Sequence, residues 1–168
     1  MADKYLKLIA GVPTQVAGST ASAGVGDAGK LVALNAQGKL DETMMPTGIG
    51  ADVAIIQASE NLVAGDFVNV WSDAGAARVR KCDGSAAGKE AHGFVLAAVA
   101  SGNLATVYFE GTNNQVSGQV PGPVYMSAAA AGAAASVAPV GAGQVVQRIG
   151  VATSASAINV ECGQHYVL

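Results

Sequence analysis

The stretch GFVLAAVASGNLATVYFEG, residues 93–111, decides the fold class. Its two apolar segments, 93–100 and 104–111, flank Ser-Gly-Asn at 101–103, which is typical of a tight turn. Apolar side chains recur at every second position, as in a strand that buries one face. The stretch therefore predicts two adjacent antiparallel strands. The side chains expected in the core are those of Phe94, Leu96, Val107 and Phe109.

The same pattern continues on both sides of this stretch. The expected strands are 53–58, 66–71, 77–82, 93–100, 104–111, 122–128, 143–152 and 157–161. Turns rich in Gly, Asn, Asp and Ser separate many of them, and the spacing is about ten residues, as in small all-β domains. The predicted fold class is all-β, a small β-sandwich or barrel. The Ala-rich segment 128–138 is open between a short helix, a loop and a strand.

Residues 1–50 differ from residues 51–168 in composition. In residues 1–50, short apolar patches alternate with Gly, Ser and Thr. We expect an extended N-terminal arm with a strand or anchor at 4–12, a loose tether, and a small hairpin at 32–41. Asn35 and Gly38 suit the ends of a type I turn in that hairpin. One helical turn could begin at Asp41 and Glu42, before Pro46. Residues 51–168 are the expected β-domain.

Glycines at positions 24, 26 and 29 have the G-x-G-x-x-G spacing of dinucleotide-binding loops. That chemistry requires a buried strand before the glycines and a helix after them. Residues 12–23 contain Pro and Gly and suit no central strand, and residues 30–48 are too interrupted for a helix of ordinary length. We therefore predict no nucleotide site here and no cofactor.

Charge and hydropathy bear on the class of partner. Only 12% of the residues are charged, and the formal net charge is −3. The one basic cluster, RVRK at 78–81, reads as a strand with Arg78 and Arg80 on its solvent face, so no nucleic-acid partner is expected. No apolar run has the length of a membrane span, and Lys7 and Pro13 interrupt the segment that would resemble a secretory signal. No membrane partner is expected either.

Composition favours association between copies of the chain. The apolar fraction is 51%, but much of it is Ala; 22 residues are Gly and only 5% are aromatic. Large side chains supply most of the free energy of burial, so a single copy of such a chain would be only modestly stable. We expect a homo-oligomer in which neighbouring chains complete the core.

The residues that could carry catalysis are few. His92 and His165 are the only histidines, and neither stands in a sequence typical of a nucleophilic triad. Cys162 and His165 lie three apart, but the other pair, Cys82 and His92, is spaced too widely for a usual zinc site. The carboxylates mostly fall at turns. We predict no catalytic residue and no metal, and favour free thiols over one disulfide, which the sequence leaves open.

Several segments carry a resemblance to a known class of proteins. They are GKLVALNAQGKLDETMMPTGIGAD (29–52), LVAGDFVNVWSDAGAARVRK (62–81), AHGFVLAAVASGNLATVYFEGTNN (91–114), PGPVYMSAAAAG (121–132) and QRIGVATSASAINVE (147–161). Together they resemble small virion proteins of tailed bacteriophages, some of them head decoration (cement) proteins and others head-fibre or appendage modules. The resemblance implies a trimeric all-β module on the capsid exterior, assembled in the host cytoplasm, with the major capsid protein as its partner.

Two functions of different classes follow from this resemblance. A cement protein bridges neighbouring major capsid subunits and stabilises the capsid, without enzymatic activity. A head- or tail-fibre module instead binds a host-surface receptor or glycan, and this requires an exposed aromatic platform. The candidate platform residues are Trp71, Tyr108, Phe109, Tyr125 and Tyr166, although their strand positions also suit a core. Low charge, small size and the N-terminal arm favour the cement function.

Contact residues are predicted in two sets, both in the N-terminal part. The arm is expected to order against a capsid subunit or a neighbouring copy, by β-strand addition to an exposed sheet edge. Its candidate contact residues are Tyr5, Leu6, Leu8, Ile9 and Val12. The candidate contacts between subunits, in and next to the predicted hairpin, are Leu31, Leu34, Leu40, Met44 and Met45.

Overall fold

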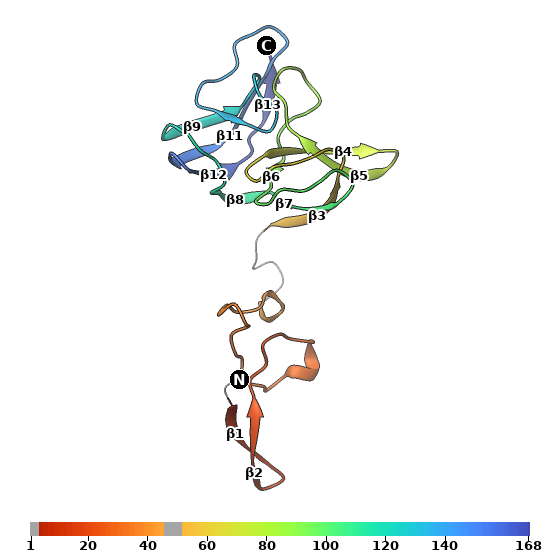
Figure 1. Ribbon diagram of the computed structural model, residues 1–168, viewed down its shortest axis with the longest axis vertical. Helices are drawn as coiled ribbons and strands as arrows, with labels where there is room; N and C mark the ends of the chain where they lie inside the picture. The colour runs from red at the N-terminus through yellow and green to blue at the C-terminus, as the bar shows by residue number, and fades with distance from the viewer. Residues whose placement is uncertain (1–3, 46–51) are drawn as a thin grey trace. The chain divides into compact units, whose positions relative to one another are not determined.

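The computed structural model describes residues 4–45 and 52–168 (Figure 1). It confirms the all-β class: the described residues form thirteen strands and two 3-10 turns and contain no α-helix. The chain divides into two compact units, residues 1–50 and 51–168, which we describe separately.

The N-terminal unit begins with a β-hairpin rather than with a single extended arm. Strands β1 (Lys4–Ile9) and β2 (Val12–Ala17) pair antiparallel through a turn at Ala10 and Gly11. The φ angles of these two residues are 50° and 81°. Positive φ at both central positions is the geometry of a type I′ turn, whose twist matches that of paired strands. The prediction that the chain after residue 12 is a loose tether is therefore wrong for 13–17.

The hairpin predicted at 32–41 forms its turn but not its strands. The N–H of Gly38 donates to the carbonyl of Asn35 (2.9 Å), and the N–H of Asn35 donates to the carbonyl of Lys39 (2.8 Å). No ladder continues beyond this turn among the described residues. A type I turn splays the chains that flank it, so a hairpin of this loop length gains little from it.

A different pairing occupies the backbone before this turn. Ser19 forms a parallel bridge with Val32: its N–H donates to Leu31 and its carbonyl accepts from Ala33, both at 2.8 Å. The 3-10 turn η1 (Val25–Asp27) lies in the loop that this bridge closes. The N–H of Ala33, expected in the 32–41 hairpin, is thus bonded to residue 19 instead.

The second 3-10 turn, η2 (Glu42–Met44), agrees with the helical turn expected at Asp41 and Glu42. The Asp41 carboxylate caps it by accepting from the N–H of Thr43 (3.1 Å) and from its hydroxyl (2.6 Å). These bonds lower the pKa of Asp41. The predicted contact residue Met45 is the C-cap.

The unit from residue 52 onward contains a closed barrel of five strands (Figure 1). They are β3 (Val53–Ala58), β4 (Phe67–Asp73), β5 (Ala76–Lys81), β6 (Gly93–Phe94) and β7 (Leu104–Tyr108). The strand order is β3-β5-β4-β6-β7, and β7 pairs with β3 to close it. All pairs are antiparallel except β3 with β5, so closure places strands that are distant in sequence side by side.

A six-stranded sheet forms the rest of this unit. Its strands are β8 (Glu110–Asn113), β9 (Gly122–Met126), β10 (Ala134–Ala135), β11 (Val145–Ser154), β12 (Ala157–Glu161) and β13 (His165–Val167). The order is β10-β9-β11-β12-β8, and β13 pairs with the start of β11. The long strand β11 thus organises the sheet, since it pairs with three others.

Two buried clusters stabilise this unit. The first consists mainly of barrel residues: Ile56, Ala58, Leu62, Val68, Val79, Val95, Ala105 and Val107. The second joins the sheet to Phe67 and Phe94 of the barrel: Phe67, Cys82, Ala91, Phe94, Val124, Met126, Val145, Ile149, Ala152, Ile158 and Val160. Barrel and sheet therefore share a core.

The prediction of paired antiparallel strands within residues 93–111 is confirmed in part. Phe94 pairs with Tyr108 in antiparallel β6 and β7, and both Phe94 and Val107 are buried. Leu96 and Phe109 are half-buried against the two clusters. However, β6 ends at Phe94, because the next residues turn aside.

The backbone of Val95 explains this early end. Its N–H donates to Asp66 (3.0 Å), and its carbonyl accepts from Gly65 (2.9 Å). Further along, Val99 forms an isolated bridge with Leu62. The strand predicted at 95–100 is therefore wrong, since these residues bond to the loop before β4.

The Ala-rich segment 128–138 contains no helix. The hydroxyl of Ser127 accepts from the N–H groups of Ala129 and Ala130, both at 3.1 Å, and this holds a turn. The short strand β10 then pairs with β9. Of the three alternatives that the sequence left open, a loop with a minimal strand is the outcome.

Candidate interaction surfaces

No residue between 4 and 45 is buried, although this unit carries many large apolar side chains. Four of the five predicted arm residues are exposed: Leu6 by 71%, Leu8 by 69%, Val12 by 61% and Ile9 by 49%. Tyr5 is half-buried. A surface of this kind is typical of a site that another protein covers.

The hairpin register sorts these side chains onto two faces, because strand residues alternate. One face carries Lys4, Leu6, Leu8, Pro13, Gln15 and Ala17, and the other carries Tyr5, Lys7, Ile9, Val12, Thr14 and Val16. Both faces thus combine apolar side chains with one lysine. Leu6 and Leu8 therefore lie on the opposite face from Tyr5 and Ile9.

The predicted subunit-contact residues also lie at the surface of this unit. Leu31, Leu34, Leu40 and Met45 are exposed by 55%, 60%, 46% and 39%. Met44 is half-buried and lines a small cavity of about 150 Å³ together with Asp27 and Lys30. The predicted hairpin that would have grouped these residues does not form, so no strand ladder aligns them.

The glycine-rich segment has no nucleotide-binding geometry. Its central residues form η1, too short for a helix with a phosphate-binding N-terminus. The Asp27 carboxylate pairs with the ammonium of Lys30 and accepts from the N–H of Ala23, and these bonds lower its pKa. The segment thus consists of turns that are held by Asp27.

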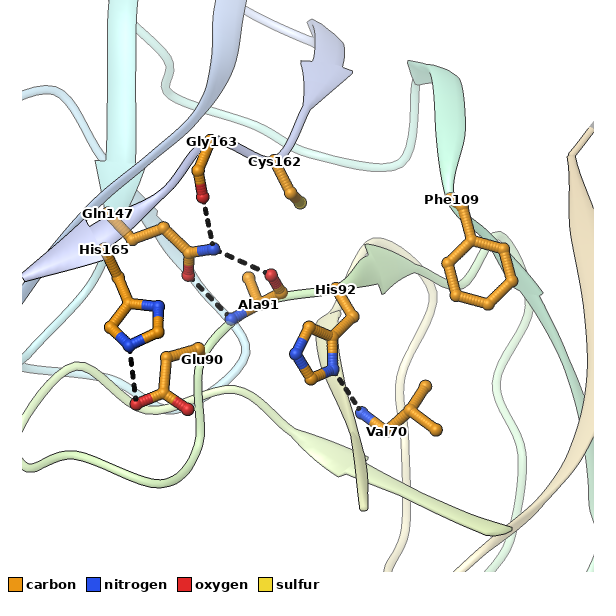
Figure 2. A pocket seen from close by; sticks show the side chains of 9 residues that line it. All are labelled: Val70, Glu90, Ala91, His92, Phe109, Gln147, Cys162, Gly163 and His165. Atoms are coloured by element: carbon orange, nitrogen blue, oxygen red, sulfur yellow. Dashed lines mark hydrogen bonds and ion pairs between the residues drawn. The ribbon is translucent and has the colours of Figure 1, made fainter.

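The second unit has a cleft of about 600 Å³ (Figure 2). The residues that line it are Val70, Glu90, Ala91, His92, Phe109, Gln147, Cys162, Gly163 and His165. They come from β4, the loop before β6, the junction between β7 and β8, β11 and the segment around β13. The cleft therefore brings together both histidines and one cysteine, which the sequence places far apart.

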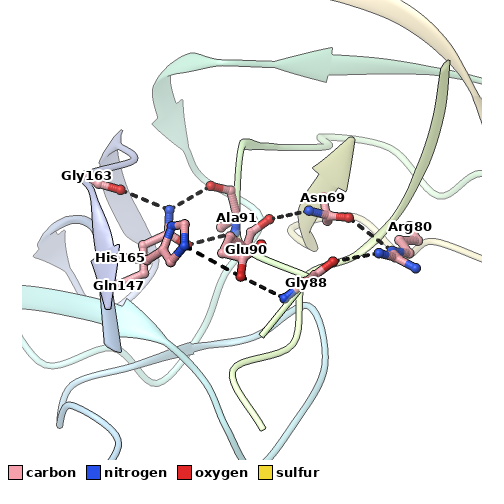
Figure 3. A network of polar contacts seen from close by, with 8 residues as sticks. All are labelled: Asn69, Arg80, Gly88, Glu90, Ala91, Gln147, Gly163 and His165. Atoms are coloured by element: carbon pink, nitrogen blue, oxygen red, sulfur yellow. Dashed lines mark hydrogen bonds and ion pairs between the residues drawn. The ribbon is translucent and has the colours of Figure 1, made fainter. Parts of the chain in front are cut away.

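A buried amide fixes the floor of the cleft (Figure 3). Gln147 is 3% exposed; its Oε1 accepts from the N–H of Ala91 (2.8 Å). Its Nε2 donates to the carbonyls of Ala91 (2.9 Å) and Gly163 (3.0 Å). Gln147 is a polar residue at a buried position of β11, next to the exposed Arg148, and this polar position was the available sequence signal for the site.

The rim of the cleft carries charge. The carboxylate of Glu90 accepts from the N–H of Gly88 (2.7 Å), and its Oε1 lies 3.7 Å from Nε2 of His165. Burial acts to raise the pKa of Glu90, but the backbone hydrogen bonds and the two nearby histidines outweigh it, so the pKa is lowered. Glu90 is therefore ionised at neutral pH.

The same loop is tied to the barrel through Arg80 (Figure 3). Its Nε donates to Oδ1 of Asn69 (3.0 Å) and its Nη2 to the carbonyl of Gly88 (2.7 Å), while Asn69 donates to the carbonyl of Glu90 (2.8 Å). The guanidinium also stacks 4.8 Å from the centre of the Trp71 ring. Arg78 and Arg80 flank the buried Val79, as the alternating pattern predicted.

The groups in the cleft do not form a nucleophilic centre. Burial raises the pKa of Cys162 to about 11 and that of Cys82, in the core, to about 12, so both free thiols are protonated at neutral pH. Nδ1 of His92 accepts from the N–H of Val70 (3.0 Å), and in the described part of the chain no hydrogen bond links a histidine to a hydroxyl or thiol. The described residues also contain no group of three or more ligating side chains placed to hold a metal.

The candidate aromatic platform is not assembled as a single surface. Tyr166 is 59% exposed, whereas Trp71, Tyr108, Phe109 and Tyr125 are half-buried. Tyr108 stacks on Phe94, with ring centroids 5.5 Å apart. Most of these rings therefore serve packing, and only Phe109 among them lines the cleft.

Across residues 4–45 and 52–168, no helix has the length and apolar character needed to cross a membrane. Comparison of the chain with protein-family models, with curated proteins and with solved structures gives no match.

Proposed function

We propose that this chain is a non-enzymatic structural protein of a tailed-bacteriophage virion, which decorates the capsid exterior and stabilises it by bridging major capsid subunits. In this proposal it acts as a trimer, assembles in the host cytoplasm and docks through its N-terminal unit. The observation that carries the proposal is the contrast between residues 4–45, none of which is buried, and residues 52–168, which have their own core.

The contrast supports docking for an energetic reason. Ordering a residue costs about 1–2 kcal/mol of backbone entropy, which burial must offset. The N-terminal unit leaves Leu6, Leu8 and Val12 more than half exposed, so it offsets little of that cost alone. A partner that covers these side chains would supply the missing burial.

Association between copies has the same basis. The second unit has two buried clusters of its own, although Ile55 and Leu104 are each 69% exposed there. The N-terminal unit has no buried residue among those described, and Leu31, Leu34 and Leu40 remain exposed, so the greater requirement for further burial lies there. We assign these three, with Met44 and Met45, to contacts within the trimer.

Co-sedimentation with capsids of the phage that encodes the chain tests this proposal. Intact protein should bind saturably and raise the temperature at which the capsids disrupt. Deletion of residues 2–17 should reduce binding at least tenfold. A matched control removes apolar surface elsewhere: Val137→Ser with Val140→Ser, whose side chains are 73% and 88% exposed, should bind as wild type.

Two results would contradict the proposal. Intact protein that fails to bind capsids, under conditions in which it is folded, would exclude decoration. Equal binding by the deletion variant would exclude docking through the N-terminal unit. Sedimentation equilibrium of the free protein tests the trimer separately, and a stable monomer at micromolar concentration would contradict it.

The second candidate function is a head- or tail-fibre module that binds a host-surface receptor or glycan. The cleft favours it, because Phe109 lines it together with Glu90 and both histidines, and ligand sites combine apolar walls with a few polar groups. Binding of fluorescently labelled protein to host cells tests this. His92→Ala and Phe109→Ala should abolish such binding while leaving capsid binding unchanged.

A further inference from the structure

We infer that the hairpin docks through the outer edge of β1, which accepts an extended, acidic strand of the capsid partner, and that the outer edge of β2 stays unpaired. This inference rests on the proposed function and names the chemistry of the partner segment. It replaces the single added strand expected from the sequence with a hairpin that offers one usable edge.

The hairpin has two free edges to begin with. In the described part of the chain, β1 and β2 pair only with each other. Each outer edge therefore presents a row of unpaired N–H and C=O groups, which is a ready template for another strand. The question is which of the two edges a partner can use.

The register shows which backbone groups point outward. In a hairpin with a two-residue turn, the flanking pair Ile9 and Val12 is hydrogen-bonded, and bonded pairs alternate with non-bonded ones. The outward-directed groups of β1 therefore belong to Lys4, Leu6 and Leu8. Those of β2 belong to their cross-strand partners Pro13, Gln15 and Ala17.

Pro13 separates the two edges. It has no N–H, so β2 lacks one of its outward donors, and proline within sheets is confined to edge strands for this reason. The outer edge of β1 contains no proline and keeps all its donors. An added strand can thus form a continuous ladder along β1 but not along β2.

Charge and apolar surface then describe the partner strand. Residues 4–17 contain Lys4 and Lys7 and no Asp or Glu. Opposite charges in facing strands stabilise a sheet, and like charges destabilise it. A second copy of this hairpin would bring four lysines together without a carboxylate. A strand with acidic residues facing the lysines and apolar ones covering Leu6 and Leu8 fits this edge better.

Proline substitution tests the edge directly, with capsid co-sedimentation as the readout. Leu6→Pro removes one outward donor from β1, and Gln15→Pro removes the corresponding donor from β2, because these two residues are cross-strand partners. Neither substitution removes a bond within the hairpin. The control Leu6→Ala removes most of the side chain but keeps the backbone N–H. It therefore shows how much of the effect of Leu6→Pro is due to the side chain alone.

We expect Leu6→Pro to weaken binding at least tenfold, Leu6→Ala to weaken it by less, and Gln15→Pro to bind as wild type. Amide NMR signals of Ile9 and Val12 establish that each variant keeps the hairpin. Equal losses for the two proline variants, or equal binding by Leu6→Pro and Leu6→Ala, would overturn the assignment to β1.

Charge reversal tests the chemistry of the partner strand. Lys7→Glu should weaken capsid binding at least tenfold at low salt, and the difference from wild type should shrink as salt rises. Lys39→Glu makes the same change of charge outside the hairpin and should have little effect. Equal effects of the two charge reversals on capsid binding would overturn the assignment of an acidic partner strand.

The remaining outcomes distinguish this inference from the proposed function. Loss of binding on deletion of residues 2–17, with no loss for Leu6→Pro, would leave capsid decoration standing and exclude the β1 edge. If Leu6→Pro instead dissociates an oligomer of the free protein without affecting capsid binding, the strand on β1 belongs to a second copy, and the inference is overturned.

Discussion

The molecule contains two hairpins built on the same local plan. Strands β1 and β2 pair over six residues each and turn at Ala10-Gly11, and β4 and β5 pair over six residues and turn at Ala74-Gly75. The φ angles of the two turns agree closely, at 50° and 81° in the first and 50° and 90° in the second. Local geometry is therefore nearly identical.

Their surroundings are opposite. The β4–β5 hairpin has neighbours on both edges, and Val68 and Val79 are fully buried in the barrel. The β1–β2 hairpin has no described neighbour on either edge and contains no fully buried residue. Turn chemistry is thus sufficient to specify a hairpin, whereas its stability depends on what covers it.

The largest expected effect separates the two hairpins by burial. Phe67, the first residue of β4, is fully buried and packs 6.3 Å from Phe94 between ring centroids. Phe67→Ala should lower the free energy of unfolding by about 3–5 kcal/mol. Leu8→Ala on β1 should change it by less than about 0.5 kcal/mol, as for an exposed site. Urea unfolding followed by the fluorescence of Trp71, the only tryptophan, measures both.

Comparable losses of unfolding free energy for Phe67→Ala and Leu8→Ala would contradict this prediction. They would show that the N-terminal hairpin contributes to the stability of the unit whose unfolding Trp71 reports.

A second prediction concerns the close approach of backbones beside β4. A Cβ at Gly93 would lie 2.3 Å from the carbonyl oxygen of Tyr108. Gly93→Ala should therefore destabilise the barrel unit by about 1–3 kcal/mol, the usual cost of overpacking. Gly26→Ala is the control, since a Cβ there meets nothing within 4 Å, and its effect should stay below about 0.5 kcal/mol. A tolerated Gly93→Ala would contradict this account of β6.

The third prediction concerns the polar side of the β4–β5 hairpin. Arg80→Lys cannot reproduce the hydrogen bonds to both Asn69 and Gly88, and should cost about 1–2 kcal/mol. Arg78→Lys, two residues away on β5, disturbs a partly exposed ion pair with Asp73 at 3.6 Å and should cost less than about 0.5 kcal/mol. Thermal unfolding of the two variants should differ in this order; equal midpoints would exclude the Arg80 network as a stabilising feature.

The smallest expected effect compares the turns themselves. Alanine at positive φ is strained, and glycine relieves the strain at a cost in unfolded-chain entropy. Ala74→Gly should therefore raise the stability of the barrel unit by about 0.5 kcal/mol. Ala10→Gly should leave unfolding detected by Trp71 unchanged and increase the hairpin population seen by NMR. If Ala10→Gly changed the free energy of unfolding measured by Trp71 fluorescence, the two hairpins would be coupled.

Local patterns in the sequence predicted much of the fold. The strands expected at 53–58 and 157–161 coincide with β3 and β12. The turn at Asn35 and the helical turn beginning at Asp41 also formed, because each depends on side chains only a few residues away. These features need no distant partner.

Predictions failed where the backbone hydrogen-bond partner of a segment lies far along the chain. The segment 95–100 has an apolar strand pattern, yet its backbone bonds to the loop before β4. The residues around 32–34 lost their expected strand to a bridge with Ser19. In each case a hydrogen-bond partner far along the chain competed with the local pattern, and residue periodicity contains no information about that competitor.

The candidate surfaces divide in the same way. The apolar arm residues were predicted from the local sequence at 4–12, and four of the five are exposed. The significance of Pro13 appears only with the register, which places its missing N–H on the outer edge of β2. The cleft of Glu90, His92 and His165 required the sheet and barrel to be placed together.

Local features of the chain are enough to predict an all-β fold with an apolar N-terminal segment and a charge-poor surface, because alternation, turn residues and composition act over short distances. Three features follow only from the tertiary structure: β3 runs parallel to β5, the barrel closes through β7, and the first hairpin has no core. Strand pairing and burial depend on contacts between residues far apart in the chain. A short stretch of sequence contains no information about the free energy of those contacts.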